Sequence, residues 1–395
     1  MTGTPKIGYF VPQFPGQTHI FFWREIMEME ARGAQVQLFS TRPPPPGLIA
    51  HDWSGQAMAR TIYLGKVRPL QALATLPALP RADMRREGPD FTRDLALSAS
   101  AARQLVQHCR RLGIAHVHVH SCGRAALTAA LAQRMGGLAY SLTLHGPLSD
   151  YGPGQRFKWR GAAFATIITA KLLAEVQAEL SPDLPARLLI QPMGVDTDAL
   201  RRDAPYVPCQ TGETLRLFSC GRLNMVKGHQ DLMQAVRLLL DRGQPVSLDI
   251  AGQDDDGGSG YRQTLQDRIT ELGLGAHVRL LGAVGAETVR AHLLGAHIFV
   301  LASWHEPLGV ALMEAMSCEV PTIGTAAGGV AELITDGLDG VLVPPKEPET
   351  LADAIAALAA DPARCLTLGQ VGRARIVTGF RAGIGAQTLL DAIAN

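Results

Sequence analysis

The sequence predicts a two-domain α/β protein whose sheets are mostly parallel, and three observations lead to this class. The chain has 395 residues, which suggests two or three domains of ~100–200 residues each. Hydrophobic residues make up 47% and charged residues 18% of the chain, so a sizeable core can form. Short β-branched or aromatic runs alternate with longer helical patterns along nearly the whole chain, which is typical of βαβ units.

Nine short runs are expected to form strands, and most are followed by a turn containing Gly or Pro and then by a helical pattern. This order favours parallel strands connected by helices. Nine strands are many for one sheet, which supports two sheets. The expected strands are Ile7–Val11, Val36–Ser40, His116–Val119, Tyr140–Leu144, Ile167–Ala170, Leu215–Ser219, Ser247–Ala251, Val278–Leu281 and His297–Leu301.

The alternation of strands and helices breaks near residues 193–214. This stretch is polar, contains Pro205 and Pro208, and has no helical periodicity. We therefore expect a first domain over 1–195, a linker over 196–214 and a second domain that begins at 215.

Charge argues against one class of function. The chain carries 37 Lys and Arg against 36 Asp and Glu, a net charge of +1, which excludes a generally basic nucleic-acid binder. Residues 1–200 hold 21 basic and 14 acidic side chains, a net +7, whereas residues 201–395 hold 16 and 22, a net −6. The basic half suits transient contact with an anionic membrane surface.

Cysteine usage and hydropathy bear on location. The 6 cysteines form no CxxC pair, which indicates buried thiols in a reducing compartment. No signal-peptide pattern begins the sequence, and no run approaches the ~18–20 apolar residues of a membrane span. We expect a cytoplasmic protein, with peripheral docking at the inner membrane face as the alternative. Residues 66–93, which mix basic and apolar side chains, are either a surface helix pair or a patch that meets a membrane or a lipid-linked acceptor.

The most informative segment surrounds Glu306 and Glu314. A buried-looking strand ends near Leu301, and a helix is expected from about Leu308, with Pro307 at its first position. Proline biases the residue before it away from the helical region, so Glu306 should lie on a loop at the carboxyl end of a strand. Ligands bind at that edge of open α/β sheets.

Glu314 falls inside the expected helix on an otherwise apolar run, where an unpaired carboxylate would be costly to bury. The helix start offers the N–H groups of Leu308, Gly309 and Val310 to an anion. Two carboxylates beside such a helix start suit a diphosphate that carries many hydroxyl groups. The alternative is one capping and one solvated glutamate.

A third element follows the strand that ends at Ser219. Arg222 and Lys227 leave its Gly-containing turn five residues apart, so two cations could neutralise a leaving diphosphate. A solvated Arg–Lys pair is the alternative. Gly328 and Gly329 would let the backbone approach a ligand closely, although a helix-entry turn explains them equally well.

Three features stand out in the first half. Gly16 lies between the first strand and a helix expected near Thr18, where its backbone could approach phosphates. His118 and His120 alternate along one strand, and His145 ends the next one. Such histidines are either polar core residues or reactive groups in a domain that otherwise lacks them.

Together these segments resemble retaining glycosyltransferase family 4, whose members have the GT-B fold. The resemblance rests on Glu306 and Glu314 with seven residues between them, on Gly-Arg-Leu…Lys-Gly at 221–228, on Pro-Met-Gly-Val-Asp at 192–196, and on the stretches at 328–332 and 340–343. Phe-Trp-Arg-Glu-Ile at 22–26 and Leu-Thr-Leu-His-Gly at 142–146 resemble its bacterial exopolysaccharide and lipopolysaccharide branch. Residues 16–20 depart from the Ser-Glu-Thr-Phe-like run of that branch on the acceptor side.

The resemblance implies two Rossmann-like domains that face each other across a cleft. The domain over 1–195 would bind the acceptor and that over 215–375 the nucleotide-sugar donor. A C-terminal helix over 376–395 would pack back on the first domain.

The resemblance also implies the role of each matched residue. Arg222 and Lys227 would bind the donor diphosphate, Glu314 the ribose and Glu306 the sugar hydroxyls. Leu308 and Gly309 would supply backbone N–H groups. His145 would reach the anomeric centre as a catalytic residue with Glu306, and Gly16 would admit the acceptor or phosphate.

The implied activity is transfer of a sugar, with retention, from a nucleoside-diphosphate sugar to a cell-envelope glycan or lipid-linked acceptor. No further cofactor and no metal are implied, and Asp254–Asp256 are expected to form a solvated loop. Alternatives are a diacylglycerol-type glycolipid acceptor, a GT-B sugar-nucleotide epimerase or phosphorylase, and a sugar-binding protein. A Rossmann dehydrogenase is poorly supported, because no GxGxxG follows an expected strand.

Overall fold

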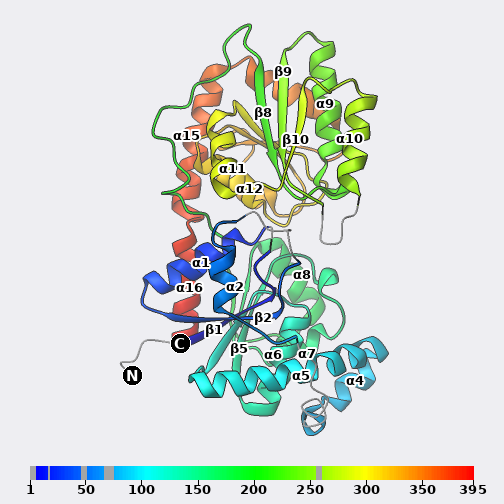
Figure 1. The fold of residues 1–395 in the computed structure, drawn as a ribbon, viewed down its shortest axis with the longest axis vertical. Helices are drawn as coiled ribbons and strands as arrows, with labels where there is room; N and C mark the ends of the chain where they lie inside the picture. Colours follow the sequence, from blue (N-terminus) through cyan, green and yellow to red (C-terminus); the bar gives the residue numbers. More distant parts are fainter. Residues whose placement is uncertain (1–5, 17, 46–50, 66–74, 255–259) are drawn as a thin grey trace. The chain divides into compact units, whose positions relative to one another are not determined.

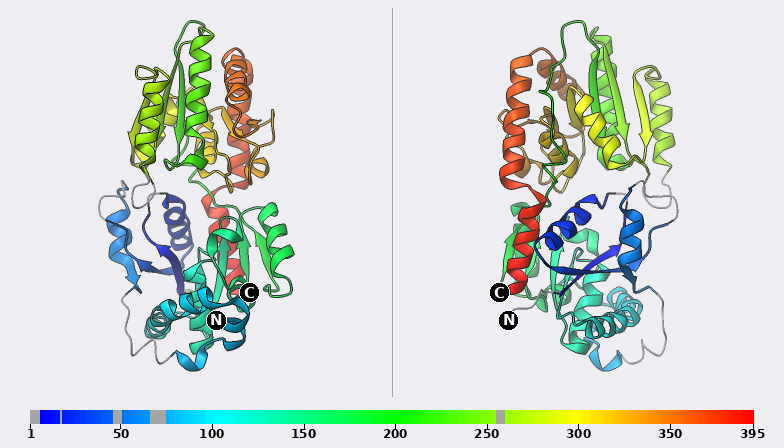
Figure 2. Two further views of the ribbon diagram at one scale, coloured as in Figure 1. Left: turned by 90° about the vertical axis from the view of Figure 1, so that its right-hand side faces the viewer. Right: turned by 60° about the vertical axis from the view of Figure 1, so that its left-hand side comes forward.

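The chain forms two compact units in a computed structural model that describes residues 6–16, 18–45, 51–65, 75–254 and 260–395 (Figures 1 and 2). The first unit takes its described residues from within 6–45, 53–192 and 385–395, and the second unit from 51–52 and 193–384. Residues 196–214, which we expect to be a linker, fall in the second unit, where Tyr206 and Cys209 contribute to the core.

The first unit is built on a parallel sheet that contains seven strands among the described residues. Its strand order is β3-β2-β1-β4-β5-β6-β7. The chain moves outward from β1 in one direction and then returns to the other side of β1 with β4, so the order reverses between these two strands. The strands are β1 (Lys6–Gln13), β2 (Gln35–Arg42), β3 (Thr61–Tyr63), β4 (His116–Val119), β5 (Ala139–Leu144), β6 (Ala165–Ile167) and β7 (Leu188–Ile190).

Helices connect these parallel strands (Figure 1). The longest, α5, begins with Pro89 in its first turn and ends at Leu112, and its C-cap Gly113 takes the left-handed conformation (φ 70°) that allows the chain to leave the helix. The helices of this unit are α1 (Ile20–Ala31), α2 (Ser54–Arg60), α4 (Arg81–Glu87), α5 (Pro89–Leu112), α6 (Arg124–Gly136), α7 (Gln155–Arg160), α8 (Ala170–Leu180) and, from Gly385 onward, α16 (Ala382–Ala394), with 3-10 turns η1 (Leu76–Ala78) and η2 (Leu148–Tyr151).

The C-terminal helix α16 is tied to the first unit by polar contacts. Thr388 Oγ1 donates to Oε1 of Gln191 at 2.8 Å, and the guanidinium of Arg187 donates to the carbonyl of Ala392 at 3.2 Å. The last eleven residues, Gly385–Asn395, accordingly group with this unit rather than with the one that precedes them in the sequence.

The second unit is built on a parallel sheet with six described strands in the order β10-β9-β8-β11-β12-β13. The order reverses between β8 and β11, and right-handed crossovers therefore place the connecting helices on opposite faces of the sheet. The strands are β8 (Leu215–Cys220), β9 (Val246–Ala251), β10 (Val278–Gly282), β11 (Ile298–Leu301), β12 (Thr322–Thr325) and β13 (Val341–Val343).

Apolar side chains on both sides of this sheet form its core. Leu232, Val236 and Leu239 recur along one side of α9 and are all buried, as expected of an amphipathic helix. They pack with strand residues such as Leu217 and Ile250. The helices are α9 (His229–Asp241), α10 (Tyr261–Glu271), α11 (Ala286–Gly295), α12 (Val310–Ser317), α13 (Val330–Leu333), α14 (Pro348–Ala359) and α15 (Pro362–Gly379), with one 3-10 turn, η3 (Met225–Lys227).

The predicted α/β class with parallel sheets in two units is confirmed, but some strands differ from expectation. The strand expected over Ile167–Ala170 ends at Ile167, because Thr169 caps α8 by accepting from the N–H of Leu172. Four strands, β3, β7, β12 and β13, have no counterpart in the sequence prediction. They contain only three or four residues each, too few to show an alternating pattern.

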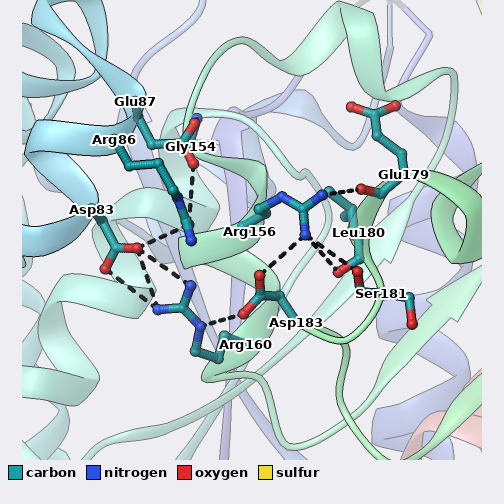
Figure 3. A network of polar contacts seen from close by, with 10 residues as sticks. All are labelled: Asp83, Arg86, Glu87, Gly154, Arg156, Arg160, Glu179, Leu180, Ser181 and Asp183. Carbon is teal, nitrogen blue, oxygen red and sulfur yellow. Dashed lines mark hydrogen bonds and ion pairs between the residues drawn. The ribbon is translucent and has the colours of Figure 1, made fainter.

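The described part of the basic and apolar stretch 66–93 is held by ion pairs; its residues 66–74 lie outside the described residues. Figure 3 shows Asp83 on α4 accepting hydrogen bonds from Arg86 and from Arg160 on α7. Arg160 also donates to Asp183 at 2.6 Å, beyond the end of α8. The network thus links α4 to α7 and, through Arg160, to the segment that follows α8. Among the described helices, none has the length and apolar character needed to cross a membrane.

Candidate active site

The end of β8 places Lys227 beside the neighbouring strand of the second sheet. After Cys220 the chain makes the turn η3, in which Asn224 accepts from the N–H of Lys227 at 3.2 Å. Gly228 follows with φ 66°, and a Cβ there would lie 1.9 Å from the carbonyl oxygen of Ala302. This close approach requires glycine and brings the turn against the end of β11.

The segment after β11 is fixed to the same turn by Trp304. Its backbone N–H donates to the carbonyl of Val226 at 2.7 Å, and its indole Nε1–H donates to Asp231 on α9 at 2.5 Å. The ammonium of Lys346 lies 4.4 Å from the centre of the Trp304 ring, a cation–π contact. The loops after β8 and β11 are therefore joined where the strand order of the sheet reverses.

Lys227 and Glu306 form an ion pair at this reversal. Nζ of Lys227 donates to Oε2 of Glu306 at 2.5 Å, and Ser303 Oγ donates to the same oxygen at 3.1 Å. Thr325, at the end of β12, donates to the carbonyl of Ser303 at 2.5 Å. Side-chain exposure is 16% for Lys227 and 10% for Glu306, so the two charges interact with little screening by solvent.

Three glycines surround the backbone and side chain of Glu306. The N–H of Gly329 donates to its carbonyl at 2.9 Å, and a Cβ on Gly328 (φ 71°) would lie 2.0 Å from that carbonyl oxygen. A Cβ on Gly309 would lie 3.5 Å from Cγ of Glu306. Gly328 and Gly329 thus support Glu306 as well as preceding the short helix α13.

The helix after Glu306 starts later than expected. It begins at Val310, with Gly309 as its N-cap, so Pro307 is not its first residue and the expected start at Leu308 is wrong. Gly309 takes the left-handed conformation (φ 99°), which separates the two preceding residues from the helix. Leu308 is buried, at 3% exposure, and Glu306 lies on the loop as predicted.

The Cys220 thiol interacts electrostatically with Glu314 and with Lys227. Glu314 lies on α12 and is 9% exposed. Burial raises the pKa of the Cys220 thiol to about 12; the Glu314 carboxylate adds to this effect and Lys227 opposes it. The thiol at the end of β8 is therefore within electrostatic reach of both charged residues.

Arg222 has an exposed side chain just beyond β8. Its carbonyl faces Nε2 of His229 at 3.2 Å, and burial lowers the pKa of His229 to about 4. The neutral imidazole therefore donates to this carbonyl and holds the loop that carries Arg222 against α9.

In the first unit, His145 and His120 lie at the carboxyl ends of β5 and β4. Their rings stack at 5.4 Å between centroids, and His120 Nδ1 lies 3.2 Å from His145 Nε2. Phe22 on α1 packs edge-on against both rings, at 4.9 and 5.4 Å. Burial, with His120 and His19 adding to it, lowers the pKa of His145 to about 3 although Glu25 opposes the shift.

His118 is a polar core residue. Its two ring nitrogens lie 2.7 Å from Ser141 Oγ and Thr143 Oγ1, and its exposure is 0%. Of the alternatives that the sequence leaves open for this histidine, the structure supports the core role.

Gly16 lies at the end of β1, and His19 packs directly on it. A Cβ on Gly16 would lie 2.5 Å from the His19 ring, and the N–H of His19 donates to the carbonyl of Gly16 at 3.0 Å. The ring of His19 contacts Phe22 edge-on at 5.1 Å, which connects Gly16 to the side chains around His145.

Within the described ranges, Cys209, Glu213 and His297 form a group whose ligand atoms lie within 4.8 Å of one another, as a metal site requires. Two contacts argue against that use. Nδ1 of His297 accepts from the N–H of Arg216 at 3.1 Å, so Nε2 carries the proton of the neutral ring, whereas a metal-bound histidine donates from its second nitrogen. Glu213 is also paired with Arg216 at 2.5 Å. Asp255 and Asp256 lie outside the described residues.

The sequence prediction missed several side chains that build both sites. It assigns no role to Ser303, Trp304, Lys346 or Glu25. A Ser three residues before a loop carboxylate could have indicated the contact of Ser303 with Glu306. The partners of Glu25 come from β1 and β4, which no local pattern reveals.

Two Rossmann-like units, each with polar residues at the strand-order reversal of its sheet, have the architecture of the GT-B fold, and comparisons with known proteins agree. Residues 210–375 match the family described as "Glycosyl transferases group 1". This range contains Lys227, Glu306 and Glu314.

Relatives extend the similarity to the first unit. The WcaL protein of Salmonella typhimurium, which bears the name of a colanic acid biosynthesis glycosyltransferase, is 26% identical over 380 residues, 89% of this chain and 90% of its own length. A GDP-mannose-dependent alpha-(1-6)-phosphatidylinositol monomannoside mannosyltransferase of Mycolicibacterium smegmatis is 31% identical over 195 residues, 46% of this chain and 50% of its own length.

Solved structures share the fold. Sucrose-phosphate synthase of Thermosynechococcus elongatus has a TM-score of 0.76 and 20% identity, with 99% of this chain and 98% of that chain covered. HepE of Anabaena in complex with UDP and glucose has a TM-score of 0.76 and 17% identity, with coverage of 98% and 99%.

Proposed function

We propose that the protein transfers a sugar from a nucleoside-diphosphate sugar to a cell-envelope glycan or lipid-linked acceptor, with the retention of anomeric configuration that the resemblance to glycosyltransferase family 4 implies. The observation that carries the proposal is the Lys227–Glu306 pair at the strand-order reversal of the second unit. Ligands bind at such reversals in open parallel sheets.

The proposed roles are those that the resemblance implies, and the chemistry of the side chains supports them. Lys227 and Arg222 neutralise the diphosphate as it leaves, Glu306 accepts hydrogen bonds from the sugar hydroxyls, and Glu314 accepts from the ribose. The N–H groups of Leu308 and Gly309 bind sugar and phosphate oxygens. When a donor binds, its phosphates replace Glu306 as the anion next to Lys227, while Ser303 keeps its contact with Glu306.

His145 and Gly16 are proposed to act from the first unit. His145 would act at the anomeric centre, as the resemblance implies, and its low pKa keeps the ring neutral, so it accepts or donates hydrogen bonds without adding charge. Gly16 would admit the acceptor or phosphate, as the resemblance implies. Catalysis is mainly electrostatic and requires no metal, because cations and backbone dipoles stabilise the departing diphosphate.

The acceptor is proposed from the names of relatives. WcaL is named for colanic acid biosynthesis, which favours a polysaccharide precursor. The mycobacterial relatives are named as phosphatidylinositol monomannoside mannosyltransferases, which favours a membrane glycolipid as the second candidate. Both acceptors would place a cytoplasmic enzyme at the inner membrane face.

Thermal unfolding with a panel of UDP-, GDP- and ADP-sugars tests donor binding, because a ligand specific for the folded state raises the melting temperature. A flat panel would contradict the proposal. The anomeric configuration of the product, measured by NMR, then tests retention, and unchanged rates in EDTA test metal independence. Conversion of labelled donor without any acceptor would instead identify an epimerase.

Membrane docking is tested separately by sedimentation with vesicles. We expect binding to vesicles that contain phosphatidylglycerol at low salt, and its loss in 0.5 M NaCl, since screening weakens contacts between exposed charges at about that concentration. Equal binding to neutral vesicles would mean that the basic first half is only a feature of surface composition.

A further inference from the structure

A chain of buried polar side chains runs from Glu25 to His145 in the first unit, and the proposed roles above do not use most of it. Tyr9 OH donates to Oε2 of Glu25 at 2.7 Å, and Nε2 of His120 lies 3.0 Å from the same oxygen. Nδ1 of His120 lies 3.2 Å from Nε2 of His145. Tyr9, Glu25 and His120 are 0%, 5% and 3% exposed, so water does not replace these contacts.

The order of donor and acceptor atoms from Glu25 to His145 determines which ring nitrogens carry a proton. Oε2 of Glu25 accepts from Tyr9 OH, and Nε2 of His120 faces the same oxygen at 3.0 Å without a well-aligned hydrogen bond. Two lone pairs at this distance would repel each other, so Nε2 of His120 carries a proton. A neutral imidazole has one N–H, and Nδ1 of His120 is therefore an acceptor. Nε2 of His145 must then donate to it, which leaves Nδ1 of His145 without a proton.

Both rings are neutral under ordinary conditions. Burial lowers the pKa of His120 well below its usual value and, with His120 and His19 contributing, lowers that of His145 to about 3. The carboxylate of Glu25 opposes the shift at His145. Only a neutral imidazole has one protonated and one unprotonated nitrogen, so only a neutral ring can be held in one tautomer.

Packing prevents the rings from turning over. Tyr9 lies against the His120 ring at 4.3 Å between centroids, and Phe22 closes the other side of His120 and His145. Helix α16 packs closely against Glu25, because a Cβ on Gly385 would lie only 3.2 Å from Oε1 of Glu25. This close packing restricts the position of the carboxylate.

We propose that Glu25 and His120 are positioning residues that hold His145 in the Nε2–H tautomer, with Nδ1 kept as a hydrogen-bond acceptor. Under the proposed function, on which the purpose of this arrangement rests, Nδ1 accepts from a sugar or acceptor hydroxyl. His145 then acts in the reaction as an acceptor and not as a donor.

The tautomer itself is measured on the unmodified protein. Labelling with ¹⁵N-histidine and long-range ¹H–¹⁵N correlation separates protonated from unprotonated ring nitrogens, and a His145→Asn sample assigns the signals among the 12 histidines. We expect His145 as Nε2–H. An Nδ1–H signal for His145 overturns the proposal without any activity measurement.

Variants test whether the chain sets the tautomer. Glu25→Gln keeps the shape but removes the anionic acceptor, and His120→Asn keeps an oxygen near the position of Nδ1 but loses the reach to Glu25. We expect a mixed tautomer at His145 and about a ten- to hundredfold lower kcat in both, with the donor KM within about twofold. His118→Asn is the control for loss of a buried histidine, because the His118 ring packs 4.5 Å from that of His120 but its two nitrogens bond Ser141 and Thr143 and not Glu25 or His145.

The outcomes separate the two proposals. If His145→Ala retains full activity, the proposed catalytic role of His145 is wrong. The tautomer measurement still shows whether Glu25 and His120 determine which nitrogen of His145 is protonated. If His118→Asn lowers kcat and the melting temperature as much as Glu25→Gln does, and the tautomer is unchanged in both, the chain is only structural and the inference is wrong.

Discussion

Nζ of Lys227 donates a 2.5 Å hydrogen bond to Oε2 of Glu306 across 79 residues of sequence. The two side chains come from the loops that follow β8 and β11, the strands between which the sheet order reverses. Without ligand, each charge neutralises the other in a place that solvent barely reaches. A ligand that carries both phosphates and hydroxyls can engage both charges at once.

Separate Lys227→Ala and Glu306→Ala substitutions are expected to lower kcat by about a hundredfold or more, because each removes charge stabilisation from the transition state. They should also lower the free energy of unfolding by about 1–3 kcal/mol, since the remaining charge is left without its partner in a shielded site. Rates with labelled donor and urea unfolding measure the two effects.

The control for these variants is Arg242→Ala. Arg242 is 43% exposed and pairs with Asp353, which is 68% exposed, so its removal should leave kcat unchanged and cost at most about 1 kcal/mol. Full activity in Lys227→Ala or Glu306→Ala would rule out the site assignment.

Gly328→Ala and Gly337→Ala form a matched pair. Both glycines have positive φ (71° and 74°), so alanine costs about 1–2 kcal/mol of backbone strain at either position. Only at Gly328 would the new methyl group meet a backbone atom, the carbonyl oxygen of Glu306 at 2.0 Å; Gly337 has nothing within 4 Å.

We therefore expect Gly328→Ala to lower kcat by at least about tenfold, because Glu306 must move, and a small displacement of a catalytic group is costly. Gly337→Ala should keep kcat and lose only stability. Steady-state kinetics and thermal unfolding of the two variants measure the difference. Equal kcat values would mean that Gly328 does not position Glu306.

Sequence alone could predict that Lys227 and Glu306 share an edge of the sheet, since both follow strands of a parallel α/β unit. The contact of Ser303 with Glu306 is local, and the spacing of three residues could have indicated it. The contact of Thr325 with the carbonyl of Ser303 could not be predicted, because it depends on the pairing of β12 with β11. The link from Glu25 to His120 joins α1 to β4, and it depends on strand order and tilt, which periodicity does not encode.

His229 provides a test of pH dependence. It is 1% exposed, and burial lowers its pKa in the folded protein to about 4 from a usual value near 6.5. Between these values the unfolded chain binds a proton that the folded chain does not. The contribution of His229 to the free energy of unfolding is therefore complete above about pH 6.5 and is lost as the pH falls toward 4.

Wild-type protein is expected to lose about 2 kcal/mol more unfolding free energy than His229→Gln between pH 7 and pH 5, because glutamine does not titrate. Its amide can still donate to the carbonyl of Arg222, which preserves that loop. Urea unfolding of both proteins at the two pH values gives the comparison. The same pH dependence in both would show that His229 protonates in the folded state.

Asp83 tests whether the ion-pair network in Figure 3 fixes α4. Its side chain is 10% exposed and accepts from Arg86 at 3.0 Å and from Arg160 at 3.3 Å. Asp83→Asn leaves two guanidinium groups together without the carboxylate, so unfolding free energy should fall by about 1–3 kcal/mol. Amide hydrogen exchange over 81–87 should become faster.

Asp90→Asn is the control, because Asp90 is 72% exposed and pairs with Arg93 at 3.4 Å, which is worth at most about 1 kcal/mol. Equal losses in the two variants would mean that the network adds no more than an ordinary surface pair.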